Sequence, residues 1–190
     1  MESLELYIKN IIPDSKEVDL KRFVELFETR ELKKNDFLWE QGQYSRYEGF
    51  VLEGCFRLFH FDRQGNDHTL YFAIKNWWVT DIDSFMNKKP SLYGIQALMD
   101  SKVLLVNREN KEKAFKEIPF TEKLFRLMAQ KSLIVHQQRI LRYNSISAEE
   151  RYFHFLDEYS NISQLVSNKQ IASYLGVTPE FISRIKKKKG

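Results

Sequence analysis

The sequence predicts an α+β protein: an N-terminal antiparallel β-roll of jelly-roll type, a long helix and a small C-terminal helical unit. Three observations lead to this prediction. Short runs of aromatic and branched residues, separated by glycine turns, fill residues 37–106. Residues 120–143 contain neither glycine nor proline and have apolar residues at helical spacing. Two short helical patterns joined by a glycine follow at residues 167–185.

The composition is that of a protein that can bury a hydrophobic core without disulfide or metal cross-links. The 190 residues are 43% hydrophobic and include 15 Phe, 9 Tyr and 3 Trp. The single Cys55 excludes an intramolecular disulfide, so a reducing compartment is expected. The N-terminus lacks a signal-peptide pattern, and no apolar run nears the roughly 18 residues of a membrane span. We therefore expect a cytoplasmic protein with no membrane partner.

The first 30 residues predict two helices that serve packing. Apolar residues recur at helical spacing over 4–12, and Pro13 ends this segment. Asp14 or Ser15 can cap a second helix. Its apolar stripe is expected to comprise Val18, Leu20, Phe23, Leu26 and Phe27.

From about residue 29 the pattern changes to that of short strands. Turns are expected around Gly42, Gly54 and Gly65. The alternation within 56–61 is imperfect, so both faces of this strand are expected to be partly covered. Many short strands with glycine turns are typical of an antiparallel sandwich or roll. The expected strands are 37–39, 49–52, 56–61, 69–73, 96–99 and 102–106.

A short helix is predicted over 109–117 and a long one over 119–144. Met128 and Val135 form a second apolar stripe beside the first on the long helix. Apolar residues on more than one face need more than one surface to cover them. The helix is therefore either a core-facing element or one shared with a second body. Its first stripe comprises Phe120, Leu124, Leu127, Ile134 and Leu141.

The C-terminal segment carries several helix-boundary signals. Ser147 with Glu150 forms one capping box, and Ser167 with Gln170 forms another. Gly176 follows the last apolar residue of the second of these helices, where a left-handed C-cap is needed. The next helix is expected to start with Thr178 as the cap and Pro179 at the first position.

These two short helices resemble the helix-turn-helix of CRP/FNR-family transcription regulators. The matched positions are Ile171-Ala172, Gly176, Ile182, and Glu180 with Arg184. The spacing of the three turn glycines, at 42, 54 and 65, is similar to that of the cyclic-nucleotide-binding β-roll of the same family. The resemblance implies a homodimeric, sequence-specific DNA-binding regulator, with RNA polymerase as a further partner. It divides the chain into a sensor domain (1–118), a dimerisation helix (119–144) and a DNA-binding domain (145–190).

The resemblance also implies which residues meet DNA. In the family the second helix enters the major groove, where a Glu and an Arg at the places of Glu180 and Arg184 read base edges. Residues 119–190 hold 12 Lys/Arg against 6 Asp/Glu, whereas residues 1–118 hold 18 against 20. A basic run is usually a solvated tail, but after this helix it suits phosphate contacts. The expected DNA-binding residues are Thr178, Pro179, Glu180, Ser183, Arg184, Lys186, Lys187, Lys188 and Lys189.

Two further expectations come from the same comparison. The family's usual β-wing has almost no counterpart after Lys189, so either this branch lacks it or the chain is shortened. The long helix would pair with its twofold mate, with Lys131 and Gln138 weakening the seam while helping to fix its register. The expected dimer interface comprises Leu124, Leu127, Lys131, Ile134, Gln138 and Leu141.

The sensor region departs from the family pattern. A cyclic phosphate needs helix N–H groups and an Arg, and the ribose needs a Glu. Asp81 stands near the place of that Glu, Thr80 replaces a Gly, and no Arg occurs between Arg63 and Arg108. Cyclic nucleotide is therefore not expected to bind by the usual contacts, and no cofactor is expected, although another small effector stays open. The candidate pocket residues are Asp81, Ile82, Asp83, Ser84, Ser91 and Leu92.

Two alternative functions remain open. One is a ligand-binding β-roll whose helical tail mediates protein contacts, and the other is a cupin-like metal enzyme. The four histidines (His60, His68, His136 and His154) lack the His-x-His and Glu spacing of a cupin metal site, so no metal is expected. Cys55 is expected to be a small buried thiol. Since no nucleophile motif or P-loop occurs, no catalytic residue is assigned and an enzyme is not expected.

Overall fold

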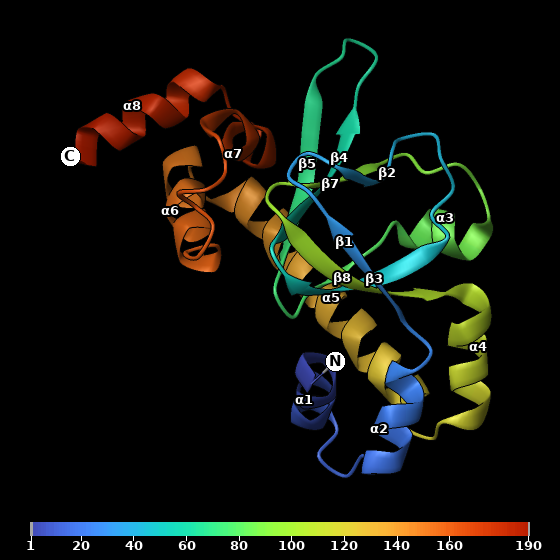
Figure 1. Ribbon diagram of the computed structural model, residues 1–190. Helices are drawn as coiled ribbons and strands as arrows, with labels where there is room; N and C mark the ends of the chain where they lie inside the picture. The colour runs from blue at the N-terminus through green and yellow to red at the C-terminus, as the bar shows by residue number, and fades with distance from the viewer. Residues whose placement is uncertain (1, 190) are drawn as a thin grey trace.

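Two four-stranded sheets form the N-terminal half of the protein (Figure 1). The computed structural model describes residues 2–189 and, for residues 188 and 189, the backbone only. The strand orders are β1-β8-β3-β6 and β2-β7-β4-β5, and every pairing is antiparallel. This confirms the predicted β-roll. The strands are β1 (Glu28–Leu32), β2 (Phe37–Trp39), β3 (Tyr47–Glu53), β4 (Cys55–Phe61), β5 (Asp67–Ile74), β6 (Trp78–Val79), β7 (Gly94–Ala97) and β8 (Ser101–Asn107).

Strands β1 and β6 were not among those expected. β1 reads Glu-Thr-Arg-Glu-Leu and buries only Leu32, so it lacks the apolar alternation by which a strand is recognised. It forms an edge of its sheet and pairs with β8 alone. β6 has two residues and pairs with Gly49 and Phe50 of β3. Both strands form by pairing with segments that are distant in the sequence, and the local residue pattern does not predict such pairing.

The strand β4 is buried on both faces, as the imperfect alternation predicted. Phe56 and Leu58 point between the sheets, where they pack with the buried Val51 and Val103. Cys55 lies on the opposite face, and it too is fully buried. A second hydrophobic layer therefore covers the outside of this sheet.

The helices follow the predicted order along the chain, with one further short helix, α3, that the sequence did not predict. They are α1 (Glu2–Ile11), α2 (Glu17–Val24), α3 (Ile82–Asn87), α4 (Arg108–Glu117), α5 (Thr121–Ser145), α6 (Ala148–Glu158), α7 (Asn168–Leu175) and α8 (Pro179–Lys189). A buried ion pair between Lys111 Nζ and Glu48 Oε2, at 2.7 Å, ties α4 to β3. Burial raises the pKa of Glu48, and Lys111 opposes that rise.

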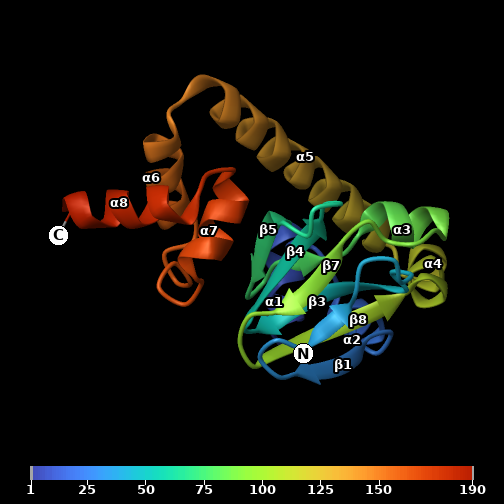
Figure 2. The same ribbon diagram turned by 90° about the horizontal axis from the view of Figure 1, so that it is seen from above.

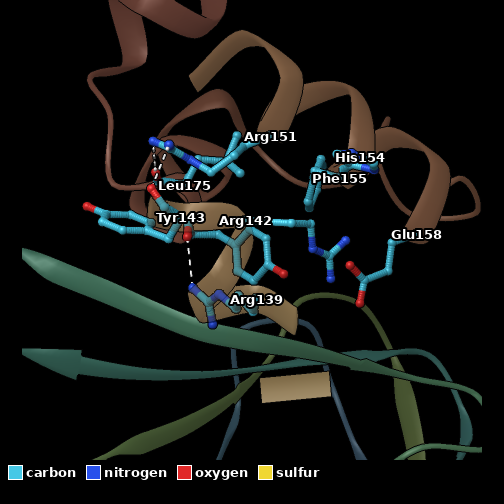
Figure 3. Close-up of a pocket in the computed structure, with 9 residues that line it drawn as sticks. Arg139, Arg142, Tyr143, Arg151, His154, Phe155, Glu158 and Leu175 are labelled. Carbon is cyan, nitrogen blue, oxygen red and sulfur yellow. Dashed lines mark hydrogen bonds between the residues drawn. The ribbon is translucent and has the colours of Figure 1, made fainter. Parts of the chain in front are cut away.

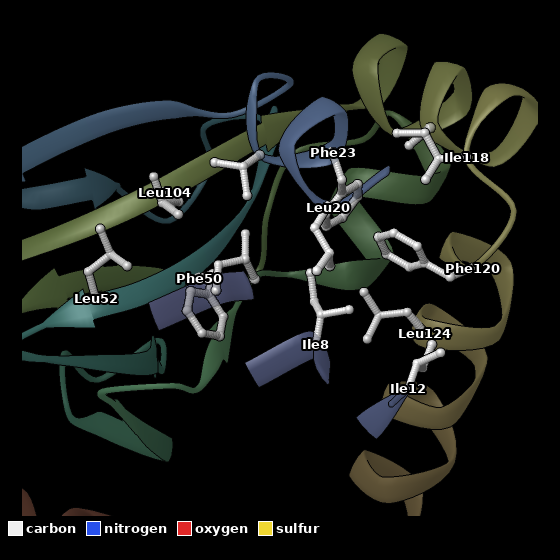
Figure 4. Close-up of a cluster of buried hydrophobic side chains, with 13 residues drawn as sticks. Ile8, Ile12, Leu20, Phe23, Phe50, Leu52, Leu104, Ile118, Phe120 and Leu124 are labelled. Atoms are coloured by element: carbon white, nitrogen blue, oxygen red, sulfur yellow. The ribbon is translucent and has the colours of Figure 1, made fainter. Parts of the chain in front are cut away.

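Helices α1 and α2 and the first turns of α5 close one end of the roll around a common core (Figure 4). Leu4, Ile8, Phe23 and Leu124 are fully buried there. Two expectations for this region are wrong. Lys16, rather than Asp14 or Ser15, is the N-cap of α2 and makes no side-chain cap bond. Val18 is 61% exposed and does not belong to the buried stripe.

The long helix α5 leaves the roll and leads to the C-terminal helices (Figure 2). Only Thr121 and Leu124 are fully buried along it. Its later part exposes large apolar side chains that nothing in the described chain covers. These are Leu133, Ile134, Ile140 and Leu141, at 58%, 52%, 62% and 65% exposure.

A third hydrophobic cluster joins the C-terminal helices to the outer face of the β4–β5 sheet. Phe72 of β5 is fully buried at its centre. Its ring centroid lies 5.9 Å from Phe155, 5.5 Å from Tyr159 and 5.5 Å from Tyr174. Tilted and edge-to-face aromatic pairs at these separations are attractive beyond the area that they bury. The C-terminal helices are thus docked on the roll. None of the helices described is long and apolar enough to cross a membrane.

Candidate functional site

Helices α7 and α8 have the boundaries that the sequence predicted. Ser167 Oγ accepts from Gln170 N at 3.2 Å, and Gln170 Oε1 accepts from Ser167 N at 2.9 Å, which completes the capping box. Gly176 is left-handed, with φ of 66°. A Cβ there would lie 2.9 Å from Tyr143 Oη, so both conformation and space call for glycine.

Helix α8 begins as predicted and packs on α7. Thr178 Oγ1 accepts from Phe181 N at 3.3 Å, which makes Thr178 the cap, and Pro179 is the first helical residue. Ile182 and Ile185 are buried in the same cluster as Ile171, Ala172 and Leu175 of α7. Thr178 and Pro179 therefore have a structural role in starting the helix, whatever else they contact.

The other face of α8 is open. A groove of about 510 Å³ runs over it, lined by Pro179, Glu180, Ser183, Arg184 and Lys187. Glu180 and Arg184 are exposed and one turn apart. No described side chain forms an ion pair or hydrogen bond with either of them, so both are available to a ligand. The guanidinium of Arg184 lies 5.5 Å from the ring centre of Phe181.

Two of the predicted DNA-contact residues, Ser183 and Lys186, form hydrogen bonds within the protein itself. Ser183 is half-buried; its Oγ donates to Pro179 O at 3.0 Å and accepts from Asn168 Nδ2 at 3.2 Å. Ser183 lines the groove with a hydroxyl that is already bound within the chain, and its contact with DNA stays a prediction. Lys186 Nζ donates to Asn168 Oδ1 at 2.6 Å, which holds its charge near the start of α7. The side chains of Lys188 and Lys189 lie outside the described part of the chain.

Helix α7 is joined to the roll by polar contacts that surround the aromatic cluster. Ser173 Oγ donates to Asp67 O at 2.7 Å and accepts from Thr69 N at 2.8 Å. Arg139 of α5 donates to the carbonyl oxygens of Leu70 and Tyr174. Its guanidinium also stacks 4.2 Å from the ring centre of Tyr174. Burial raises the pKa of Tyr174, and the Arg139 charge opposes that rise.

The predicted sensor residues come together around the start of α3. Their polar groups there form hydrogen bonds within the chain and cap the helix. Asp81 is buried and is the N-cap of α3, where its Oδ1 accepts from Asp83 N and Ser84 N. Its other oxygen lies 2.6 Å from Ser91 Oγ. Ser84 Oγ accepts from Ser45 N and donates to Lys89 O. The Asp81 carboxylate thus has partners on both oxygens without a ligand.

The remaining sensor residues point elsewhere. Asp83 pairs with Lys89 at 2.5 Å, and this pair holds the pKa of Asp83 below its usual range. Ile82 and Leu92 are 53% and 56% exposed. Arg108 approaches α3 only at its end, where Nη1 donates to Met86 O at 3.3 Å. A ligand role for these six residues stays a prediction.

The predicted interface residues on α5 fall into two groups. Leu124 is fully buried in the core of its own chain, so it does not belong on an exposed seam, and that expectation is corrected. The reason is that α1 and α2 cover the start of α5, a contact between segments more than a hundred residues apart. Leu127 is half-buried, whereas Lys131, Ile134, Gln138 and Leu141 are exposed. Their pairing across a dimer stays a prediction.

Both histidines of the roll have a hydrogen-bond partner within the roll. His60 Nδ1 lies 2.8 Å from Leu92 O, and His68 Nε2 lies 3.0 Å from Asp62 Oδ2. Among the residues that the structure describes, no three His, Cys, Asp or Glu gather as a metal-binding group. Cys55 is a buried thiol, as predicted, and burial raises its pKa to about 12.

Sequence reasoning missed the residues that hold α7 and α8 in place. Asn168, which binds both Ser183 and Lys186, and Ser173 read as ordinary polar positions in a helix. In the sequence, Arg139 is only one of the many basic residues of the C-terminal part, and nothing distinguishes it from the others. Their partners lie 15 to 106 residues away in the chain, so no local spacing could have singled them out.

Comparisons with known proteins agree with the fold described above. Residues 29–117 match the cyclic nucleotide-binding domain. The structure is similar to FixK2 from Bradyrhizobium japonicum (20% identity, 85% of this chain and 83% of that chain, TM-score 0.74). It is also similar to CLP, a c-di-GMP-responsive global regulator from Xanthomonas campestris (14% identity, 91% and 91%, TM-score 0.73).

A third similar structure is a putative CRP/FNR-family transcriptional regulator from Eubacterium rectale (18% identity, 91% and 82%, TM-score 0.71). No curated protein sequence matches the chain significantly. At these identities the structures establish a common fold. They confirm the predicted resemblance to CRP/FNR regulators at that level.

Proposed function

We propose that this protein is a transcription regulator, because residues 29–117 match the cyclic nucleotide-binding domain and the chain has the fold of CRP/FNR regulators. In this proposal it binds DNA as a homodimer and reads sequence through α8. The observation that carries the proposal is the open face of α8, where Glu180 and Arg184 form no ion pair or hydrogen bond within the described chain.

The chemistry of that face suits a major groove. An Arg can donate two hydrogen bonds to the O6 and N7 of guanine, and a Glu can accept from the amino group of cytosine. Lys187 lines the same groove, and Lys186 lies beside the start of α7. Ammonium groups at the ends of such a helix neutralise phosphates and contribute affinity that is independent of sequence. RNA polymerase is the further partner that this function would require.

The homodimer is supported by the exposed apolar side chains of α5. Ile134 and Leu141 lie seven residues apart and are more than half exposed. Leu133 and Ile140 repeat at the same spacing beside them. Apolar residues repeating every seven positions form the seam of a two-helix coiled coil. A second copy of α5 would cover both rows, and it would place two α8 helices on one DNA duplex.

The sensor domain is not proposed to hold a cyclic nucleotide in the usual manner. Ser91 stands near where the family places its arginine, and its hydroxyl is bound to Asp81. The Asp83 and Lys89 charges satisfy each other. A cyclic phosphate there would be desolvated without a guanidinium partner, which costs several kcal/mol by an order-of-magnitude estimate.

Selection of binding sites from random DNA tests the proposal. The full-length protein should return a twofold-symmetric motif, and Arg184→Ala should lose preference at one base pair per half-site. We expect Arg184→Ala to weaken binding to the selected site by about 1–3 kcal/mol. Arg46→Ala, which removes an exposed arginine from the roll, is the matched control and should retain the motif. If both variants selected the motif of the parent protein, α8 would not be the reading helix.

A further inference from the structure

Helix α7 is anchored at its C-terminal end by two arginines (Figure 3). The carbonyl oxygen of Tyr174 accepts from Arg139 Nη2 at 2.9 Å. That of Leu175, the last residue of the helix, accepts from Arg151 Nη2 at 3.5 Å. Guanidinium groups at this end of a helix satisfy free carbonyls and face the negative end of the helix dipole. Ser173 also ties α7 to β5, so α7 is a fixed support for the helix that packs on it.

Helix α8 packs on this support through apolar side chains. Ile182 and Ile185 are buried in the same cluster as the apolar face of α7, but hydrophobic contact is non-directional and does not place polar side chains. Among the residues that the structure describes, Asn168 is the only one outside α8, apart from the cap Thr178, whose side chain hydrogen-bonds to that helix. The placement of polar groups on α8 therefore depends on one asparagine at the start of α7.

Asn168 is half-buried, and its amide contacts two side chains of α8. Oδ1 accepts from Lys186 Nζ at 2.6 Å, and Nδ2 donates to Ser183 Oγ at 3.2 Å. Ser183 Oγ donates its own hydrogen to Pro179 O at 3.0 Å, so toward Asn168 it can only accept. A lysine can only donate. The site therefore requires one acceptor and one donor side by side, which an asparagine supplies and an aspartate does not.

The contact with Asn168 places a cation beside the groove of α8. Lys186 is exposed and does not line the groove, whose cationic side chains are Arg184 and Lys187. Its ammonium is directed to the start of α7 instead. The amide that holds it is neutral, so Lys186 keeps its charge, and two of its three N–H groups remain for another acceptor. Because a free lysine loses much rotamer freedom when it is ordered, the contact leaves a preorganised cation where α7 and α8 meet.

We propose that Asn168 is a positioning residue for DNA binding, which holds the Lys186 ammonium in place for a phosphate of the DNA backbone. The inference rests on the proposed function, in which the groove face of α8 meets base edges. Phosphates border the major groove, so the flank of a helix that enters the groove faces them. Because Lys186 is ordered before DNA arrives, binding the phosphate costs it less conformational entropy.

Binding of the full-length protein to its selected DNA site, measured over a range of salt concentrations, tests the inference. Asn168→Ala should weaken binding about three- to tenfold per protomer, because the phosphate itself must then order Lys186. The sequence motif should not change, since phosphate contacts carry no sequence information. Asn161→Ala, which removes an exposed asparagine from the segment before α7, is the matched control and should bind like the parent protein.

A double-mutant cycle separates positioning from a purely structural role. In the Lys186→Ala protein, the further change Asn168→Ala should leave the affinity for DNA unaltered, because the side chain through which Asn168 acts is gone. A loss in that background as large as in the parent protein would overturn the inference. A changed motif in Asn168→Ala alone would do the same, because Asn168 would then act on base reading.

Asn168→Asp gives an independent readout. An aspartate suits the first turn of a helix, so this variant should fold. Its carboxylate would pair with Lys186 and neutralise it. The slope of log affinity against log salt should therefore fall by about 1 per protomer, as in Lys186→Ala. A slope equal to that of the parent protein would contradict the proposed contact between Lys186 and a phosphate.

The outcomes also separate this inference from the proposed function. Sequence-specific binding by the parent protein, retained at full affinity in Asn168→Ala, would refute the role of Asn168 alone. Absence of sequence-specific binding by the parent protein would refute the proposed function and this inference with it.

Discussion

The substitution Phe72→Ala should release the C-terminal helices from the roll without unfolding the roll. Phe72 points away from the inter-sheet core, and its ring is fully buried against Phe155, Tyr159 and Tyr174. Truncating a buried phenylalanine typically costs about 3–5 kcal/mol, including the lost aromatic pairs. If that loss falls on the docked state, the population of the undocked state should rise roughly 10²- to 10⁴-fold.

The single cysteine provides the assay. Cys55 is fully buried in the same cluster as Phe72, and burial raises its pKa to about 12. At pH 8 roughly one molecule in ten thousand would hold a thiolate there, against about a quarter for an exposed cysteine of ordinary pKa. Reaction with a disulfide reagent should therefore proceed through the undocked state, and its rate should follow the population of that state.

The rate of Cys55 labelling in Phe72→Ala should exceed that of the parent by the same two to four orders of magnitude. Phe61→Ala is the matched control, since Phe61 lies in β4 and is 42% exposed. It should label at the parent rate. Circular dichroism should show that the strands persist in both variants. Labelling of Phe72→Ala at the parent rate would refute the reasoning, because Cys55 would then be protected by something other than the docked helices.

Three other outcomes are expected. Ile134→Glu should convert a dimer into a monomer in sedimentation, whereas Leu6→Glu, which charges an exposed apolar residue on α1, should not; a dimer in both would place the interface elsewhere. Replacing Lys186 and Lys187 by alanine should weaken binding to all DNA sequences alike and reduce the slope of log affinity against log salt by about 2. An unchanged slope would place both lysines away from the phosphates. Calorimetry should detect no binding of cyclic AMP or cyclic GMP below roughly millimolar concentration, and a micromolar constant would contradict the account of the sensor.

Interactions between residues that are close in the sequence determined most of the helices and strands and where they begin and end. The capping boxes at Ser147 and Ser167 and the left-handed Gly176 act within four residues, so their chemistry is complete in the sequence. The absence of Gly and Pro over 120–143, together with apolar residues at helical spacing, predicts one long helix, which is α5. The imperfect alternation in β4 also reflects burial on both faces, which holds from Cys55 to Phe59 and not for the exposed Phe61.

Tertiary structure decided how the parts meet. Leu124 reads like the other apolar residues of α5, but α1 and α2 cover it, and only the packed chain distinguishes it from Ile134. The Asp81 carboxylate reads as a ligand group until Ser91, ten residues later, folds back onto it. Such contacts form only when loops close and segments far apart in the sequence become buried together. The spacing of neighbouring residues carries no information about either process.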